Sequence, residues 1–197
     1  MARPPDRRTE VLTMSLRLPR TIRLDPSDTF VFERAAEPGE WAVTGTFLFW
    51  DDDVAALTGK RRAAFRAGFV GVESLGFSTL VVIAPATEAE REGAVASLAR
   101  HIHERFGAPS IEAARQAARQ EIDFAASLCQ DEAGTTIALH RTLEDGTIRE
   151  QFRTLHRAPS PDGADRLHAH ARAFEFVEVE DEPKERVDLA ALAEAKR

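Results

Sequence analysis

The stretch TTIALHRTLEDGTIREQFRTLHR, residues 135–157, decides the fold of this chain. Asp145-Gly146 stands between two runs of alternating apolar and polar residues, which favours a two-residue type I′ turn because both central positions need positive φ. The turn pairs Glu144 with Thr147, and the register continues outward along both runs. The further opposite pairs are Leu143 with Ile148, Leu139 with Phe152, and Ile137 with Thr154. The apolar members of these pairs, Ile137, Leu139, Leu143, Ile148 and Phe152, form the predicted buried face of a β-hairpin.

The predicted hairpin needs a neighbouring strand, and FSTLVVIA at residues 77–84 is the best candidate. It is apolar at nearly every position, which is typical of a strand covered on both faces and therefore central in its sheet. The first third of the chain also favours strands, over residues 18–24, 29–33 and 41–49. In the last of these, alternation places Trp41, Val43, Phe47 and Phe49 on one face.

Helical periodicity dominates the middle of the chain. After Asp51–Asp53, a helix is predicted around Val54–Phe65, with an interruption at Gly59, and the glycines at 68, 71 and 76 predict a loop. Thr87 and Glu90 have the spacing of a capping box at the start of a long helix. Ser110 can cap a second long helix. The apolar stripe of that helix is Ile111, Ala114, Ala118, Ile122, Ala125 and Cys129.

These elements predict a single α+β domain over residues 14–197, with a mixed or mainly antiparallel sheet and the helices packed on one face. Residues 171–182, ARAFEFVEVEDE, predict an acidic edge strand, and residues 186–197, RVDLAALAEAKR, a short amphipathic helix. Residues 1–13 have no strand or helix pattern, and we expect them to be a disordered extension.

The charge and cysteine content exclude several functional classes. The net charge of −7 argues against binding to nucleic acids or to anionic membranes, because both require a basic surface. Cys129 is the single cysteine, which excludes an internal disulfide and is typical of a reducing cytoplasm. On its apolar helix stripe, Cys129 is expected to be a small buried side chain rather than a nucleophile. No cofactor motif is found, so we expect none.

The run Asp51-Asp52-Asp53 has two interpretations. Asp51 and Asp53 could form a metal or phosphate site at the end of a strand. Alternatively, one aspartate caps the following helix and the others favour its positive N-terminal dipole.

Lys60, Arg61 and Arg62 form a basic cluster that follows Gly59 but lacks the other residues of a phosphate-binding loop. They could bind an anion or a partner, or simply form a solvated helix face.

Six histidines are present, and their spacing limits metal binding. His101 and His103 are about 200° apart on a helix, and in the predicted register His140 and His156 occupy opposite faces of the hairpin. His168 and His170 could share one face of a strand, which makes them the only candidate metal pair.

Two further stretches, LPRTIRLDPSDTFVFERAAEPGEWAVTG (residues 18–45) and GAPSIEAARQAARQEIDFAASLC (residues 107–129), carry a family resemblance. From about Met14 the chain resembles a family of small, uncharacterised alphaproteobacterial proteins, a domain of unknown function without established catalytic residues. Such proteins tend to accompany maturation proteins of molybdenum-dependent formate dehydrogenases, and the resemblance therefore implies an accessory role.

We therefore expect a non-enzymatic cytoplasmic accessory or assembly protein that acts through a protein partner or by self-association. The alternative is a small enzyme or ligand-binding domain with a metal or phosphate site at Asp51 and Asp53.

Overall fold

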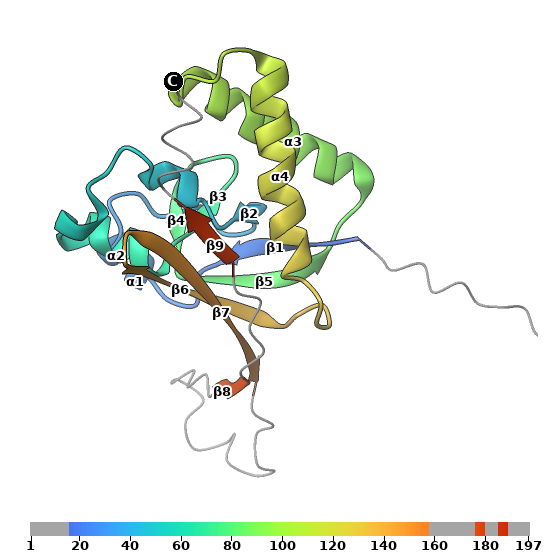
Figure 1. Cartoon of the computed structure of the whole chain (residues 1–197). Helices are drawn as coiled ribbons and strands as arrows, with labels where there is room; N and C mark the ends of the chain where they lie inside the picture. Colours follow the sequence, from blue (N-terminus) through green and yellow to red (C-terminus); the bar gives the residue numbers. More distant parts are fainter. Residues whose placement is uncertain (1–15, 158–175, 180–184, 189–197) are drawn as a thin grey trace, which may run out of the picture.

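Two antiparallel sheets form the scaffold of the molecule (Figure 1). The computed structural model describes residues 16–157, 176–179 and 185–188. The strands are β1 (Arg17–Ile22), β2 (Ala42–Val43), β3 (Phe69–Gly71), β4 (Phe77–Ser78), β5 (Leu80–Pro85), β6 (Thr136–Glu144), β7 (Thr147–Arg157), β8 (Phe176–Val179) and β9 (Glu185–Asp188). The large sheet has the order β1-β5-β6-β7-β8, with β9 also pairing with β7, and the small sheet has the order β2-β3-β4.

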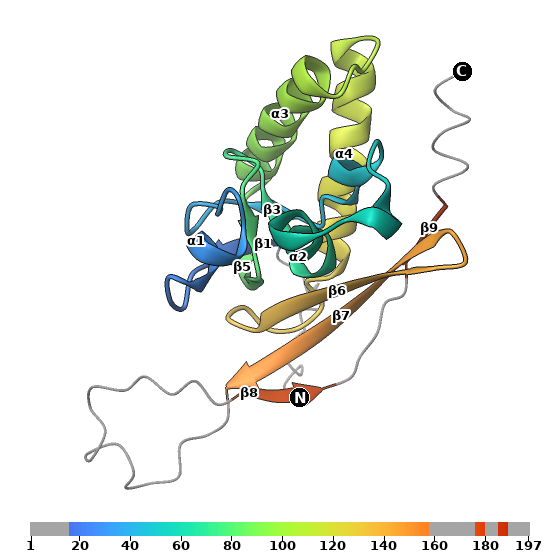
Figure 2. The same cartoon turned by 90° about the vertical axis from the view of Figure 1, so that its left-hand side faces the viewer.

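The helices lie mainly on one side of the large sheet. They are α1 (Ser27–Val31), α2 (Gly59–Ala67), α3 (Glu88–Arg105) and α4 (Ile111–Ser127), with short 3₁₀ helices η1 (Thr46–Phe49) and η2 (Val54–Ala56). In both views α3 and α4 stand above the sheet, and α2 lies over β6 (Figures 1 and 2). The chain therefore folds as a single α+β domain, as the sequence predicts.

The hairpin has the predicted register. Asp145 and Gly146 both have positive φ, 52° and 79°, as a type I′ turn requires. Glu144 pairs with Thr147, and Ile137 pairs with Thr154 at the far end of the ladder. The predicted apolar face is buried apart from Leu143, which is half-buried. The prediction omitted Arg141 and Glu150, which face each other in the same register and are each only 1% exposed.

The predictions for the long helices are confirmed, and the prediction for the central strand is confirmed in part. Phe77–Ser78 form β4 of the small sheet, whereas Leu80–Pro85 form β5, along which buried residues alternate with more exposed ones. β5 pairs with β1 on one side and with β6 on the other. Thr87 and Glu90 form the capping box, in which the Thr87 hydroxyl accepts from the Glu90 N–H and the Glu90 carboxylate accepts from the Thr87 N–H. Ser110 caps α4 by accepting from the N–H of Ala113. The α4 stripe is buried except for its first member, Ile111, which is 45% exposed.

The predicted strand over residues 41–49 is wrong. The strand ends after two residues, and Gly45 then adopts a φ of 75° before η1 begins. A side chain at Gly45 would overlap the side chain of Val70 on the neighbouring strand β3. Both this overlap and the positive φ require glycine at position 45. The alternation that suggested a strand continues by coincidence into the 3₁₀ turn, where Thr46 and Phe49 point into the core.

Two other local predictions need correction. Residues 29–33 were predicted as a strand, but α1 occupies most of this segment. The carboxylate of Asp28 in α1 is buried and accepts hydrogen bonds from the N–H and hydroxyl of Thr79, a partner 51 residues away. The glycine-rich segment that predicted only a loop contains β3 and precedes β4, which together with β2 form the small sheet.

The C-terminal predictions are tested only in part. Residues 176–179 form β8, the last strand in the order of the large sheet, within the predicted edge strand. Residues 185–188 form β9 rather than the start of a helix, because they pair with Thr147–Glu150 of β7. The extension over residues 1–13 and the rest of the C-terminal helix lie outside the described residues.

Candidate functional site

The segment between β2 and α2, residues 44–58, contributes to two concave surfaces. A buried polar cluster holds the first residues of this segment in place. We define the Arg141 cluster as Arg141, Glu150 and Thr46. The Arg141 Nε lies 2.5 Å from the Glu150 Oε1 and donates to the Thr46 hydroxyl at 3.1 Å. The Thr46 hydroxyl donates to the same carboxylate oxygen. Both charged side chains are fully buried, so solvent does not screen this pair.

The Arg141 guanidinium also binds backbone carbonyls from three places in the chain. Its Nη1 donates to the carbonyls of Phe65 and Gly68, at 3.0 and 3.1 Å, and its Nη2 donates to the carbonyl of Thr44. Arginine suits this role because its planar group carries five donors in a fixed fork. The cluster therefore connects the hairpin to the end of α2 and to the start of the 44–58 segment.

A second arginine stabilises the middle of that segment. The Arg61 side chain in α2 forms an ion pair with Asp52, with 2.7 Å between Nη2 and Oδ2, and donates to the carbonyl of Leu48 at 2.6 Å. Its guanidinium also lies 4.4 Å from the centre of the Phe49 ring, within the range of a cation–π contact. Arg61 thus folds the turn after η1 back onto α2.

The first concave surface is an apolar groove of about 200 Å³ between η1, α3 and α4. We define the apolar groove by its lining residues, Phe47, Trp50, Ile102, Phe106, Ala117, Gln120 and Glu121. Ile102 is buried, whereas the two phenylalanines and the tryptophan are half-buried. The rings of Phe47 and Phe106 meet edge to face, with 5.5 Å between their centroids. The groove is thus a partly exposed aromatic surface with a polar border on α4.

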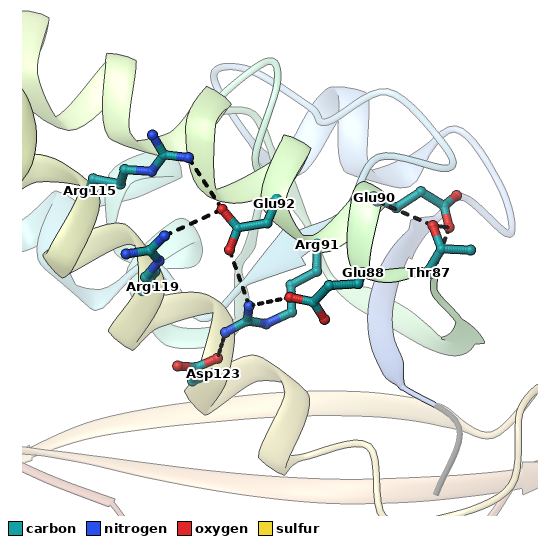
Figure 3. A network of polar contacts seen from close by, with 8 residues as sticks. All are labelled: Thr87, Glu88, Glu90, Arg91, Glu92, Arg115, Arg119 and Asp123. Carbon is teal, nitrogen blue, oxygen red and sulfur yellow. Dashed lines mark hydrogen bonds and ion pairs between the residues drawn. The ribbon is translucent and has the colours of Figure 1, made fainter. Parts of the chain in front are cut away.

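A network of ion pairs joins α3 to α4 (Figure 3). These two helices form one wall of the apolar groove. We define the interhelical network as Glu88, Arg91, Glu92, Arg115, Arg119 and Asp123. Arg91 on α3 pairs with Asp123 on α4, and Glu92 on α3 pairs with Arg115 and Arg119, at 3.2 and 3.4 Å. The hydrogen bond from Arg115 is the main cause of a Glu92 pKa below its ordinary value.

The second concave surface is a basic cleft of about 450 Å³ between η2, α2 and β6. We define the basic cleft by its lining residues, Val54, Ala55, Arg62, Phe65, Arg66, Arg141, Thr142 and Leu143. Arg62 and Arg66 lie one turn apart on α2 and are exposed. Phe65 is buried and closes the floor with other apolar side chains.

The three aspartates that the sequence predicts as a site or a cap lie in different surroundings. Asp51 and Asp53 are exposed, whereas Asp52, between them, is half-buried against Arg61. The capping interpretation is wrong, because α2 begins only at Gly59 and neither its N-cap, Thr58, nor the N-cap of η2, Asp53, makes a side-chain capping bond.

The three residues of the predicted basic cluster point to different partners. Lys60 donates to the carbonyl of Phe32 at 3.4 Å, and Arg61 pairs with Asp52. Arg62 lines the basic cleft together with Arg66, which the sequence analysis did not single out. Their i, i+4 spacing on one helix was the available signal.

The histidine candidates give no common site in the described part of the chain. His101 and His103 contact different backbone carbonyls, those of Glu73 and Ala108. His168 and His170, and the side chain of His156, lie outside what the structure describes. Within the described residues, no group of three or more metal-ligating side chains comes together.

Cys129 is buried, as predicted, and burial raises the pKa of its thiol to about 12. The thiolate is the reactive form, so this thiol is a poor nucleophile at neutral pH.

None of the helices in the described segments combines the length and apolar character that crossing a membrane requires.

These features define a small α+β domain with an apolar groove and a basic cleft, both of which are lined in part by the segment between β2 and α2. The chain belongs to DUF6505, a family of unknown function, whose model matches residues 14–175. This confirms the resemblance to an uncharacterised family. Neither the curated proteins nor the solved structures contain a significant match.

Proposed function

We propose that this protein is a non-enzymatic accessory protein that binds an amphipathic helix of a partner protein in its apolar groove. The observation that supports this proposal is the groove itself, in which Phe47, Trp50 and Phe106 remain partly exposed beside buried Ile102. Partly exposed aromatic side chains in a concave surface are the usual anchors of protein–protein contacts. A groove between helices receives a partner helix through apolar residues repeated every three or four positions.

Charge favours a partner helix with a basic border. Gln120 and Glu121 form the polar side of the groove, and the whole chain carries a net charge of −7. Electrostatic complementarity of this kind increases the association rate and disfavours acidic competitors. The partner segment should therefore combine leucine-like anchors with lysine or arginine next to them.

The family resemblance indicates which partners to test first. Maturation proteins of molybdenum-dependent formate dehydrogenases, and those enzymes themselves, are the first candidates, with the cytoplasm as the expected location. The partner helix can also come from a second copy of this chain, which would then self-associate through the same groove. Size-exclusion chromatography with light scattering distinguishes a homodimer from a heteromeric complex.

Affinity purification from the native host tests the proposal when three forms of the chain are compared. The wild type should recover one stoichiometric partner, whereas Trp50→Ser should lose most of it, because an aromatic anchor commonly contributes 2 kcal/mol or more, at least about 30-fold in affinity. Phe30→Ser is the matched control, because Phe30 is 72% exposed on α1 and does not line the groove.

Each other result identifies a different site or function. Loss with Phe30→Ser but not with Trp50→Ser would move the docking surface to α1 and contradict the proposal. Retention in both variants would exclude both apolar surfaces. The same samples, analysed for metal and phosphate, test the alternative at Asp51 and Asp53: a bound metal ion or phosphate released by Asp51→Asn or Asp53→Asn would favour a ligand-binding domain or an enzyme.

A further inference from the structure

The basic cleft concentrates positive charge in a protein that is acidic overall. Arg62 and Arg66 project from the same side of α2, and the lining residues include no carboxylate. The charge of Arg141 at the floor is balanced by Glu150. Glu144, whose carboxylate accepts from the Thr142 hydroxyl at 3.2 Å, is paired with Arg149 at 2.8 Å. Within the described part of the chain, the two exposed guanidinium groups of Arg62 and Arg66 therefore remain over the cleft.

A neighbouring histidine reports the same positive field. Burial lowers the pKa of His140, and the charges of Arg66 and Arg153 lower it further. Of these two arginines, Arg66 belongs to the lining of the basic cleft, so the charge of the cleft reaches His140 in β6. A bound anion would neutralise part of the field and raise the pKa of His140.

Apart from Thr142, the rest of the lining is apolar, which suggests an organic ligand. Val54, Phe65 and Leu143 provide three hydrophobic walls. The volume of about 450 Å³ lies within the range of small-molecule sites, roughly 300–1,000 Å³. Bidentate arginine contacts select planar or tetrahedral oxyanions, above all phosphates and carboxylates.

We propose that the basic cleft binds a small organic anion, whose phosphate or carboxylate group contacts Arg62 and Arg66 and whose apolar part lies against Val54, Phe65 and Leu143. This site is separate from the apolar groove, and the proposal does not depend on the partner helix. A ligand in the basic cleft would contact both α2 and β6, the two elements that the Arg141 cluster joins.

Titration with defined probes tests this proposal. Phenyl phosphate, benzoate, inorganic phosphate and phenol are added to the full chain at low ionic strength, with calorimetry for affinity and NMR for the His140 resonance. We expect phenyl phosphate or benzoate to bind more tightly than inorganic phosphate or phenol, because only the first two carry both an oxyanion and an apolar group. Which of the two binds more tightly distinguishes a phosphate from a carboxylate ligand. Binding should raise the pKa of His140.

Three arginine variants identify the site. Arg62→Gln and Arg66→Gln should each weaken binding about tenfold or more, the effect expected for losing one charge-assisted contact. Arg100→Gln removes an exposed arginine from α3, outside the cleft lining, and should change affinity less than about twofold. All three sites are exposed, and thermal melts check that each variant folds.

Three results would overturn the proposal. The first is that neither phenyl phosphate nor benzoate binds at about 10 mM, where a Kd of this order corresponds to only about 3 kcal/mol. The second is that Arg100→Gln weakens binding as much as Arg62→Gln and Arg66→Gln do. The third is that phenol binds as tightly as the two organic anions. The second would indicate nonspecific charge attraction, and the third a purely apolar cavity.

Discussion

The Arg141 cluster and the interhelical network use the same chemistry, arginine paired with carboxylate, but they differ in burial. Both partners in the Arg141–Glu150 pair are fully buried, whereas Glu92 and Arg115 in the network have side chains that are 35% and 49% exposed. The two assemblies fix opposite walls of the apolar groove. The Arg141 cluster fixes the loop that carries Phe47 and Trp50, and the network fixes α3 against α4 (Figure 3).

This difference in burial determines what each assembly contributes to the stability of the fold. A buried charge that loses its partner retains its full desolvation cost, whereas an exposed charge is rehydrated and screened by salt. The Glu150 Oε2 has no hydrogen-bond partner within the described residues, so its charge depends on the contacts of Oε1 alone. We therefore expect the Arg141 cluster to decide whether the fold and the groove form, and the network only to adjust the packing of the helices.

Removing Glu150 should have the largest effect. Glu150→Ala leaves the Arg141 charge buried without its counterion, and we expect a loss of about 3–5 kcal/mol in the free energy of unfolding, measured by urea denaturation. Glu144→Ala is the matched control, because it also breaks a glutamate–arginine pair in this hairpin, but between side chains that are 46% and 44% exposed. Equal effects of the two substitutions would contradict the importance assigned to burial.

Gly45→Ala should have the second-largest effect, through the backbone of the same loop. The substitution introduces both strain at a φ of 75° and an overlap with Val70, together about 2–4 kcal/mol. Gly107→Ala is the control, because Gly107 has a similar φ of 69° but open space where the added Cβ would lie. The difference between the two melting curves isolates the contact with Val70, and a difference near zero would show that Gly45 is required only for its φ.

Asp123→Asn should have a much smaller effect. It breaks the pair with Arg91, but the Asp123 side chain is 57% exposed and Arg91 keeps its pairs with Glu88 and Glu92, so we expect a loss below about 1 kcal/mol. Because exposed pairs are screened, the loss should vanish at about 1 M salt, where the Debye length is only about 3 Å. A salt-independent loss of several kcal/mol would mean that the network behaves like the buried cluster.

His140 should give the smallest effect, seen only in acid. Its pKa is lowered in the folded state, so the folded chain binds fewer protons than the unfolded chain at mildly acidic pH. Its contribution to stability is therefore complete above the unfolded pKa of about 6.5 and is lost as the pH falls below that value and through the lower pKa of the folded state. His140→Gln should flatten the decrease in melting temperature between about pH 7 and pH 5. An unchanged pH profile would show that His140 has its ordinary pKa.

The elements that the sequence predicted correctly are those held by contacts between residues that lie close together in the chain. The hairpin, the capping box of α3 and the cap of α4 depend on residues within about 20 positions, and all three were found. Arg141 and Glu150 were within reach of the same argument, because the predicted register places them opposite each other on the buried face. The apolar pattern alone does not indicate them, because hydrophobic periodicity assigns only apolar residues to a buried face.

The elements that were not predicted depend on distant contacts. Gly45 ends β2 because Val70 packs against it, and α1 depends on the contact between Asp28 and Thr79. The apolar groove and the basic cleft each combine residues from three elements, so no local pattern indicates them. Among the predicted site residues that the structure describes, only Arg62 lines one of these surfaces.

Photo-cross-linking from position 50 tests the central claim most directly. A photoreactive phenylalanine analogue replaces Trp50 in the native host, with the same analogue at Phe30 as the control, and the cross-linked peptide is mapped by mass spectrometry. We predict one major product from position 50, in which the attached peptide is an amphipathic helical segment with basic residues, from a partner protein or from a second copy of this chain. A product only from position 30, or an intramolecular cross-link from position 50 to residues 189–197, would contradict the claim that the groove binds a partner.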